Sequence, residues 1–325
     1  MNISWIFAVS TCFLFSNSLY NYSSNNNTLP FSGSGTYSDP YLISTKEDLA
    51  SFSDFVNNGN DCSGSYVALT SNIDLEGDEI TPIASYNSEI PFYGTFDGRG
   101  HTISNFTITG GNAGFFGRLG GCVANLGLEN AVISGNCVGG IASHAKGSEA
   151  LIINCYTEVT FEKYNRAGGI ADNFNGYIYN SYSNCTFLSE NTHGGMVSYF
   201  ARGVYYSYSN EDFYLSNSSM EDSRFHECKV LPSEELDSLE TANLLNDLAV
   251  KSAFLSSFEG ELNKWGLNQS GLTFINERFD RVQIHQIKYL FANIHNLWPF
   301  LLLIVPFGIV PTIFLINRKK KHPKK

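Results

Sequence analysis

Short apolar runs separated by polar and glycine-rich turns return at a fixed interval in the middle of the chain. The clearest repeat is a phrase that aligns without gaps in three copies and places tyrosines 26 residues apart. Such an interval, with strand-forming residues and no room for a second long element, predicts coils that stack on copies of themselves. The copies are NCYTEVTF at 154–161, NSYSNCTF at 180–187 and YSYSNEDF at 206–213; their tyrosine column is Tyr156, Tyr182 and Tyr208, and their phenylalanine column is Phe161, Phe187 and Phe213.

Glycine pairs precede these phrases and mark a second turn in each unit. Gly139, Gly168 and Gly194 are equivalent, and Gly114 belongs to a looser relative. Each is followed by an apolar residue, a polar turn and a short β run. One such coil cannot bury its own inner face, whereas stacked coils bury each other's. The pattern predicts an all-β solenoid of the parallel β-helix type.

The segment before the repeats predicts a strand and an amphipathic helix. Tyr41–Ile43 is the expected strand, followed by a helix cap at Ser44 or Thr45 and a helix end at Gly59. A helix here would cover the unpaired edges at the open end of the stack. Its expected buried face is Leu49, Phe52, Phe55 and Val56.

The segment after the repeats predicts a second helical cap. Ser233 begins an acidic first turn, and Trp265 with the GLTFI strand at 271–275 is expected to close the other open end. The expected buried stripe of this helix is Leu236, Leu239, Leu244, Leu245 and Leu248.

Both termini carry apolar segments of the kind that direct a chain to a membrane. Ile3–Phe15, followed by small polar residues, predicts a signal peptide cleaved before Leu19. Leu297–Ile316 is uncharged, long enough to span a bilayer, and followed by a basic tail that favours the cytoplasmic side. The chain is therefore expected in the plasma membrane as a single-pass protein, with its N-terminal domain outside and its C-terminal tail inside.

These features divide the chain into expected segments. They are a signal peptide (1–18), a flexible lead-in (19–35), an N-terminal cap with the first coils (36–90), β-helix repeats (91–215), a C-terminal helix with a closing strand (216–276), a juxtamembrane stalk (277–296), a transmembrane helix (297–316) and a basic cytoplasmic tail (317–325).

Composition matters mainly for what it excludes. Without the two terminal segments the chain keeps all 31 acidic residues but only 14 of the 20 basic ones, which argues against nucleic acid or anionic lipid as the partner of this region, because either requires clustered lysines and arginines. No phosphate loop, dinucleotide fingerprint or Cys/His metal spacing occurs, so neither a cofactor nor a metal is expected. Removing Cys12 with the signal peptide leaves an even set that is compatible with disulfides: Cys62, Cys122, Cys137, Cys155, Cys185 and Cys228.

Asn-x-Ser/Thr triplets make the outer part a candidate for N-glycosylation. Chance alone would produce a similar number, so the triplets permit glycosylation without demonstrating it. They begin at Asn21, Asn26, Asn105, Asn184, Asn217 and Asn268.

At family level the chain resembles GLUG-motif proteins of the right-handed parallel β-helix type, over about residues 36 to 275. The resemblance rests on PYLISTKEDLASFSDFVN, YVALTSNIDLEG, PFYGTFDGRGHTISNFTI, GFFGRL, NLGLENAVISG and the GGIA units. Members are mostly surface or secreted proteins, often adhesin-like, and the repeat is not a known catalytic motif. The resemblance implies a right-handed β-helix that serves adhesion or recognition.

Catalysis has to be weighed because β-helices also carry polysaccharide lyases and hydrolases. In FDGRGHTI, Asp97, Arg99 and His101 alternate on one side of an extended segment. We favour a structural role over a catalytic one for this segment: it forms a turn in which Asp97 caps the backbone and the glycines adopt positive φ. Glu129 and Glu158 align between coils, where solvent exposure is favoured over a metal site. We therefore assign no catalytic residue.

Binding is the favoured class of function. Tyr156, Tyr182 and Tyr208 can stack on sugar rings if their column is exposed, or fill the coil if it is internal. The expected function is a single-pass surface glycoprotein presenting a β-helix to an extracellular glycan or protein. The alternatives are a membrane-tethered polysaccharide lyase or hydrolase and a structural coat protein.

Overall fold

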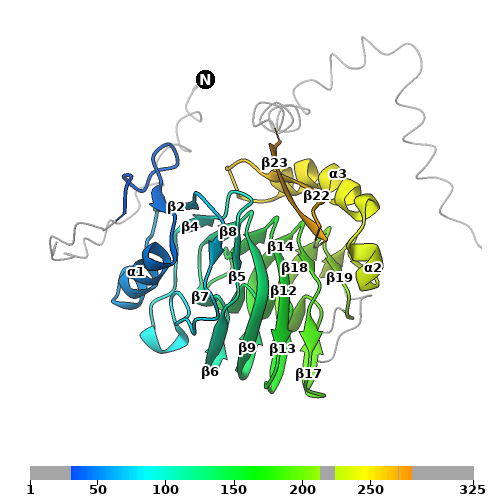
Figure 1. The fold of residues 1–325 in the computed structure, drawn as a ribbon, viewed down its shortest axis with the longest axis horizontal. Coiled ribbons are helices and arrows are strands. Elements are labelled where there is room, and N and C mark those ends of the chain that lie inside the picture. Colours follow the sequence, from blue (N-terminus) through cyan, green and yellow to red (C-terminus); the bar gives the residue numbers. More distant parts are fainter. Residues whose placement is uncertain (1–30, 213–223, 270, 280–325) are drawn as a thin grey trace, which may run out of the picture. The chain divides into compact units, whose positions relative to one another are not determined.

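The structure is a computed structural model that describes residues 31–212, 224–269 and 271–279. This part of the chain is an all-β parallel solenoid, as the repeat spacing predicts (Figure 1). Within the coils, strands pair in parallel with equivalent strands of the neighbouring coils, so the two large sheets run along the stack.

The strands of the solenoid form two large parallel sheets. The first consists of β1 (Tyr41–Ile43), β2 (Tyr66–Leu69), β4 (Thr95–Asp97), β7 (Phe116–Leu119), β8 (Cys122–Ala124), β10 (Ala142–Ala145), β11 (Leu151–Ile153), β14 (Ala171–Tyr179), β18 (Val197–Tyr205) and β20 (Phe225–His226). The second consists of β3 (Ile73–Asp74), β5 (Thr102–Ser104), β6 (Thr107–Ala113), β9 (Gly127–Gly139), β12 (Tyr156–Phe161), β13 (Arg166–Gly168), β15 (Tyr182–Ser183), β16 (Thr186–Phe187), β17 (Thr192–Gly194), β19 (Tyr208–Ser209) and β21 (Lys229–Val230).

The register of these sheets reproduces the spacing in the sequence. Tyr156 pairs with Tyr182, and Tyr182 pairs with Tyr208. Phe161 pairs with Phe187, and their rings stack at 5.0 Å between centroids. The third phenylalanine of that column, Phe213, lies outside the described residues. The 26-residue repeat therefore corresponds to one coil.

The N-terminal helix α1 (Lys46–Asn57) covers the apolar interior of the first coils, as expected. Thr45 caps it: its side chain accepts from the Asp48 amide, and the Asp48 carboxylate accepts from the Thr45 amide. Phe52 packs edge-on against Phe92 at 5.9 Å. Phe55 is only half-buried, because Ser53 takes the buried position and donates to the Thr81 carbonyl at 3.0 Å.

The C-terminal segment packs along the flank of the coils, so the expectation that it closes the open end is wrong. It comprises α2 (Ser233–Leu236), α3 (Leu239–Leu255) and the antiparallel hairpin β22 (Asn263–Leu267) with β23 (Leu272–Arg278). Figure 1 shows α3 and the hairpin lying over several successive strands. The Trp265 ring lies 6.0 Å from that of Tyr156 and 5.5 Å from that of Tyr182, which belong to two different coils. We name this segment the flank cap.

The buried stripe of the flank cap also differs from the expected leucines. Leu236 and Leu245 are buried, whereas Leu239 is 60% exposed at the first position of α3. Ala249 and Ala253 lie against the coils instead, in one cluster with Ile153. Small residues let the helix approach a sheet that already carries large tyrosines, which a pattern of leucines does not reveal.

The expected membrane segments lie outside the described residues. These are the signal peptide at 1–18, the span at 297–316 and the basic tail at 317–325. None of the helices in the described ranges is both long and apolar enough to cross a bilayer.

All six cysteines in the described residues are free thiols. An even number of cysteines is compatible with disulfides, but these cysteines form none in the structure. Cys155 and Cys185 are buried between coils. Burial raises the pKa of the Cys155 thiol to about 12. These thiols therefore stay protonated at neutral pH and pack as small apolar groups.

Candidate functional site

The tyrosine column is internal, so an exposed sugar-stacking platform at these residues is not what the structure holds. Tyr156 and Tyr182 are 0% exposed, and Tyr208 is 2% exposed. The first two rings stack at 4.9 Å with an interplanar angle of 5°. Trp265 and Phe274 of the flank cap cover them. The tyrosines are buried because each lies at a corner of its coil, where the flank cap packs over the rings and removes a large aromatic surface from water.

A ladder of asparagines marks the neighbouring corner. Asn125, Asn154 and Asn180 are fully buried and have positive φ angles of 50°, 56° and 47°. Asn154 donates to Asn125 at 2.8 Å, and Asn180 contacts Asn154 at 2.8 Å. Asparagine tolerates the left-handed backbone, and each amide satisfies its neighbour in the next coil. The ladder is therefore a structural device that fixes the register.

Asp97 ends this ladder and is a turn residue, as the sequence favours. Its carboxylate accepts from Asn125 at 2.8 Å, from the Tyr66 hydroxyl at 2.8 Å and from the Arg99 amide at 2.9 Å. Burial raises the pKa of Asp97. Arg99 has a φ of 51°, and the adjacent Gly100 has a φ of 79°. His101 faces Asn72 at 3.1 Å, and burial lowers its pKa. The three residues form a tight corner.

Glu129 and Glu158 pair between coils beside the tyrosine column, as their alignment predicts. Glu129 accepts from the Tyr156 hydroxyl, and Glu158 accepts from the Tyr182 hydroxyl at 2.8 Å. Burial, together with Asp237 and Glu129, raises the pKa of Glu158 to about 7, although the bond from Tyr182 opposes this. Both glutamates are partly exposed, so they face solvent only in part, and the flank cap adds to the desolvation of Glu158.

A different surface gathers exposed polar and aromatic groups suited to binding. Arg118, His144, Asn173 and Phe200 pair in sequence across β7, β10, β14 and β18, one residue per coil. All four are partly exposed. Further aromatic rings and guanidinium groups flank this row. We name the set the arginine–aromatic face: Arg118, Arg166, Arg202, Arg224, His144, Asn173, Tyr86, Tyr177, Tyr199 and Phe200.

Guanidinium groups of this face are held over aromatic rings. Arg118 lies 4.3 Å from the centroid of Tyr86, whose ring is also 5.0 Å from that of His144. Arg202 donates through Nε to the Tyr177 hydroxyl at 2.7 Å. Such stacking restricts the conformational freedom of the guanidinium groups and leaves N–H donors for hydrogen bonds to a ligand. Burial lowers the pKa of His144, which makes it a neutral hydrogen-bonding group at pH 7.

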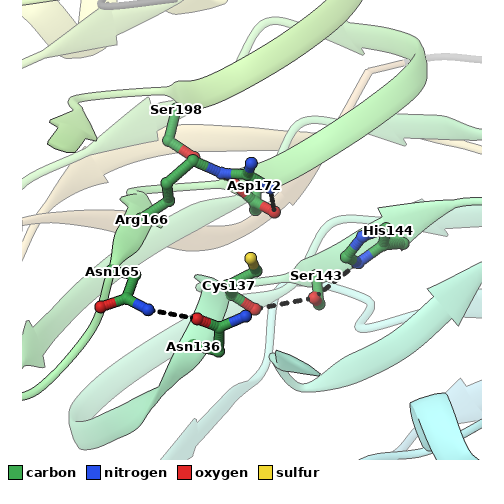
Figure 2. A network of polar contacts seen from close by, with 8 residues as sticks. All are labelled: Asn136, Cys137, Ser143, His144, Asn165, Arg166, Asp172 and Ser198. Atoms are coloured by element: carbon green, nitrogen blue, oxygen red, sulfur yellow. Dashed lines mark hydrogen bonds and ion pairs between the residues drawn. The ribbon is translucent and has the colours of Figure 1, made fainter. Parts of the chain in front are cut away.

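Arg166 is fixed by an ion pair at the edge of this face (Figure 2). It donates to both carboxylate oxygens of Asp172, at 3.0 and 2.9 Å, and Ser198 donates to the same carboxylate. The Asp172 side chain is 0% exposed, whereas that of Arg166 is 27% exposed. The guanidinium lies 4.4 Å from the ring centroid of Tyr199. Asp172 therefore positions Arg166 rather than facing a ligand.

The serine, histidine and cysteine in the same network do not form a nucleophilic site. Ser143 Oγ lies 2.8 Å from His144 Nδ1 and donates to the Cys137 carbonyl at 3.0 Å (Figure 2). Ser143 is fully buried, so no substrate reaches its hydroxyl. Burial raises the pKa of the Cys137 thiol, with Asp172 acting in the same direction.

Sequence reasoning missed the arginine–aromatic face. Its row of residues could have been found from the spacing, because Arg118, His144 and Asn173 each lie four or five residues after one of the aligned glycines. The residue type at this position changes in every coil, so the position does not stand out as a repeat. Tyr86 and Arg166 come from other segments, and only folding brings them to this flank.

The sequons in the described residues differ in accessibility. Asn268 is exposed, and Asn105 is partly exposed but donates to Asp74 at 2.9 Å. Asn184 accepts from Ser233 at 2.8 Å, at the edge of the flank cap, which a glycan would displace. Asn21, Asn26 and Asn217 lie outside the described residues.

Two grooves adjoin each other, the first of them beside α1, and we name them together the cap trough. The first has a volume of about 410 Å³ and a floor that includes Leu49, Ile83 and Phe115. The second, of about 370 Å³, runs along β6, and both are lined by Glu79 and its neighbours. Neither Glu129 nor Glu158 lines either groove.

No family model matches the chain. The chain is 32% identical over 157 residues to halomucin from Haloquadratum walsbyi, a match that covers 44% of this chain and 2% of halomucin. Its fold is similar to that of a "putative immunoglobulin A1 protease" from Bacteroides ovatus, at 19% identity and a TM-score of 0.40, covering 75% of this chain and 95% of that one.

Proposed function

We propose that the chain is a cell-surface recognition protein whose β-solenoid presents the arginine–aromatic face to an anionic glycan. The observation that carries the proposal is the row of Arg118, His144, Asn173 and Phe200, with one residue per coil. Coils are about 4.8 Å apart. A row with this spacing suits an extended polymer that offers similar groups at regular intervals.

The charge distribution supports an anionic ligand. The chain has a net charge of −11, yet this flank gathers four arginines, of which Arg166 has a buried carboxylate partner. Guanidinium groups bind carboxylate and sulfate oxygens in a bidentate manner, and the rings beneath them offer faces to sugars. Neutral His144 and Asn173 add hydrogen-bonding groups for hydroxyls.

Location and topology belong to the same proposal. We place the chain in the plasma membrane as a single-pass glycoprotein, with the solenoid outside and the basic tail inside. The apolar stretch at 297–316 and the likeness to halomucin, a mucin by name, support this placement. A GLUG-type right-handed β-helix also remains part of the proposal, supported by the GGIA units.

Binding without catalysis is proposed because the acidic residues available for chemistry have other contacts. Asp97 is saturated by three donors at a buried turn. Glu129 and Glu158 each accept from a tyrosine beside the flank cap. A polysaccharide lyase or hydrolase needs such carboxylates beside an open substrate cleft.

The test is glycan binding by the purified full chain in neutral detergent. Polygalacturonate, a sulfated glycan and neutral dextran are immobilised, and retention and released product are scored together. We expect retention on the anionic glycans that weakens with salt, and no new reducing ends. Retention on dextran alone or cleavage of any glycan would overturn the proposal. Neither retention nor cleavage on any of the three glycans would also overturn it and would favour a structural coat protein.

Matched variants locate the site. Arg118→Gln with Arg202→Gln removes two charges from the face, whereas Lys163→Gln removes an exposed charge from a loop elsewhere. We expect the first to weaken retention about tenfold or more and the second to leave it unchanged, since charge-assisted bonds contribute about 1.5–3 kcal/mol each when desolvated.

A further inference from the structure

The cap trough combines an apolar floor with an acidic rim. Leu49, Ile83 and Phe115 are buried beneath the first groove. Lys46 is the only lysine or arginine between residues 31 and 98, and it already pairs with Glu76 and with Asp78, the latter at 3.4 Å. The rim carboxylates are Glu47, Asp54, Asp78 and Glu79. This composition is complementary to a segment that carries both cationic and apolar side chains.

The second half of the trough runs along an open strand edge. In the described ranges, β6 pairs with β9 on one side, and on the other it makes a single bridge, between Thr107 and Glu79. The Thr107 amide donates away from β9, to the Asp78 carbonyl at 2.9 Å. Because backbone groups alternate along a strand, those of Thr109 and Gly111 point the same way, into the trough.

The second groove leaves room for another backbone beside this edge, because it has a volume of about 370 Å³ and is lined by Thr109 and Gly111. Gly111 is exposed and has no side chain that would crowd an added strand. An open, flat edge of this kind is a template for an added strand. Its neighbour Gly110 likewise has no side chain to block the approach.

We infer that the cap trough binds a cationic, amphipathic peptide segment of a partner protein as a strand added to β6. Its backbone pairs with Thr109 and Gly111, its basic side chains face the rim, and its apolar side chains enter the floor beside Phe115. The two grooves share Glu79, Ile80 and Thr81, so the trough is continuous and longer than one compact ligand requires.

Other occupants fit the trough less well. An anionic glycan would meet the rim carboxylates, and only Lys46 could oppose them. The described residues contain no group of three or more histidine, cysteine, aspartate or glutamate side chains arranged to hold a metal ion. The trough borders the arginine–aromatic face at Tyr86, which lines the second groove, but its rim is acidic and Lys46 is the only cationic side chain that lines either groove. The two sites therefore call for ligands of opposite charge, and binding at each can be tested without the other.

The test uses the purified full chain and a fluorescent KVKVKV peptide, with EVEVEV as the matched probe. Fluorescence anisotropy measures affinity, and hydrogen exchange measures the amides of Thr109 and Gly111. We expect the lysine peptide to bind at least tenfold more tightly than the glutamate peptide and to protect both amides. Equal binding of the two peptides, or binding without protection, would overturn the inference.

Variants separate the rim from the edge. Glu47→Gln with Asp54→Asn changes two exposed positions of α1, and we expect about fivefold weaker binding, as two exposed ion pairs provide. Gly111→Pro removes the outward N–H without touching a bond to β9, and we expect binding to be lost. Glu162→Gln, exposed on another loop, should have no effect. If Gly111→Pro fails to fold, the inference is tested by the Glu47→Gln and Asp54→Asn variant and by the hydrogen-exchange measurement. Wild-type affinity in that variant would refute the site.

Discussion

Asn154 donates through Nδ2 to Oδ1 of Asn125 at 2.8 Å, and both residues are fully buried with left-handed backbones. The same two amides also reach the flank cap. Asn154 donates to the Asn263 carbonyl at 3.0 Å, and Asn125 donates to the Glu261 carbonyl at 2.9 Å. The ladder therefore joins coil to coil and coils to cap, which makes it a good place to test the architecture.

Replacing Asn154 should separate its two roles. Asn154→Gly keeps the positive φ but removes the amide, which leaves the Asn125 oxygen with fewer donors; we expect a loss of about 1–3 kcal/mol in the free energy of unfolding. Asn154→Ala should lose about 1–2 kcal/mol more because alanine is strained in the left-handed region. Denaturant unfolding of both variants measures this, and equal stabilities would contradict a role for backbone conformation.

Glu158 should make the stability depend on pH. Its pKa in the folded chain is raised to about 7 from an ordinary value of 4.5, so the folded state holds a proton that the unfolded state releases. Its contribution is most favourable below about pH 4.5 and is lost as the pH rises to about 7. Glu158 faces Tyr182, Glu129 and Asp237. We therefore expect Glu158→Gln to unfold at a higher temperature than the wild type at pH 8.

The comparison at low pH provides the control for Glu158. At pH 5 the wild-type carboxyl is mostly protonated in the folded state, so the two proteins should melt closer together. Thermal unfolding followed by circular dichroism at both pH values is sufficient. A difference that stays constant between pH 5 and pH 8 would show that Glu158 does not titrate in this range.

Trp265 should anchor the flank cap. It is 1% exposed and contacts Tyr156, Tyr182 and Phe274. Trp265→Ala should cost about 3–5 kcal/mol and open the hairpin to proteases. Leu267→Ala, in the same hairpin but 41% exposed, should change little. Limited proteolysis measures how readily the hairpin is cleaved. A hairpin that stays resistant to cleavage in Trp265→Ala would argue against the anchoring role.

Arg166 should stabilise the chain through Asp172. Arg166→Gln leaves a buried carboxylate without its cation, which costs about 3–5 kcal/mol for a fully buried pair. Because Arg166 is 27% exposed, we expect the lower end, about 3 kcal/mol. Asp172→Leu combined with Arg166→Leu should recover much of this loss, because neither charge then remains unpaired. Lys163→Gln serves as the charge control, and unfolding free energies of the three variants give the comparison.

The period of the chain was sufficient to predict the coils. Stacking places Tyr156, Tyr182 and Tyr208 one coil apart, so a spacing of 26 residues translates directly into parallel register. The helix at Lys46–Asn57 was equally accessible, because Thr45 and Asp48 form a local capping box. Such features depend on neighbours in the sequence or on a repeat, and both are visible without a structure.

The candidate sites depended on folding. Tyr86 reaches His144 and Arg118 only because the coils stack, and Trp265 covers Tyr182 only because the flank cap folds back over the coils. Alternation along a strand tells which side chains share a side, but it does not tell which side another segment will cover. That is why the tyrosine column could be predicted as a column and not as a buried one.

The sequence by itself determined the stacked parallel coils, the helix that covers their first end and the turn at Asp97, because each follows from a repeat or from contacts within a few residues. The tertiary structure decided which face is exposed. The flank cap buries the tyrosines and raises the pKa of Glu158, while it leaves Arg118, His144 and Arg202 accessible. Burial is set by contacts between segments more than 100 residues apart, such as Asn125 with Asn263, and no local pattern encodes them.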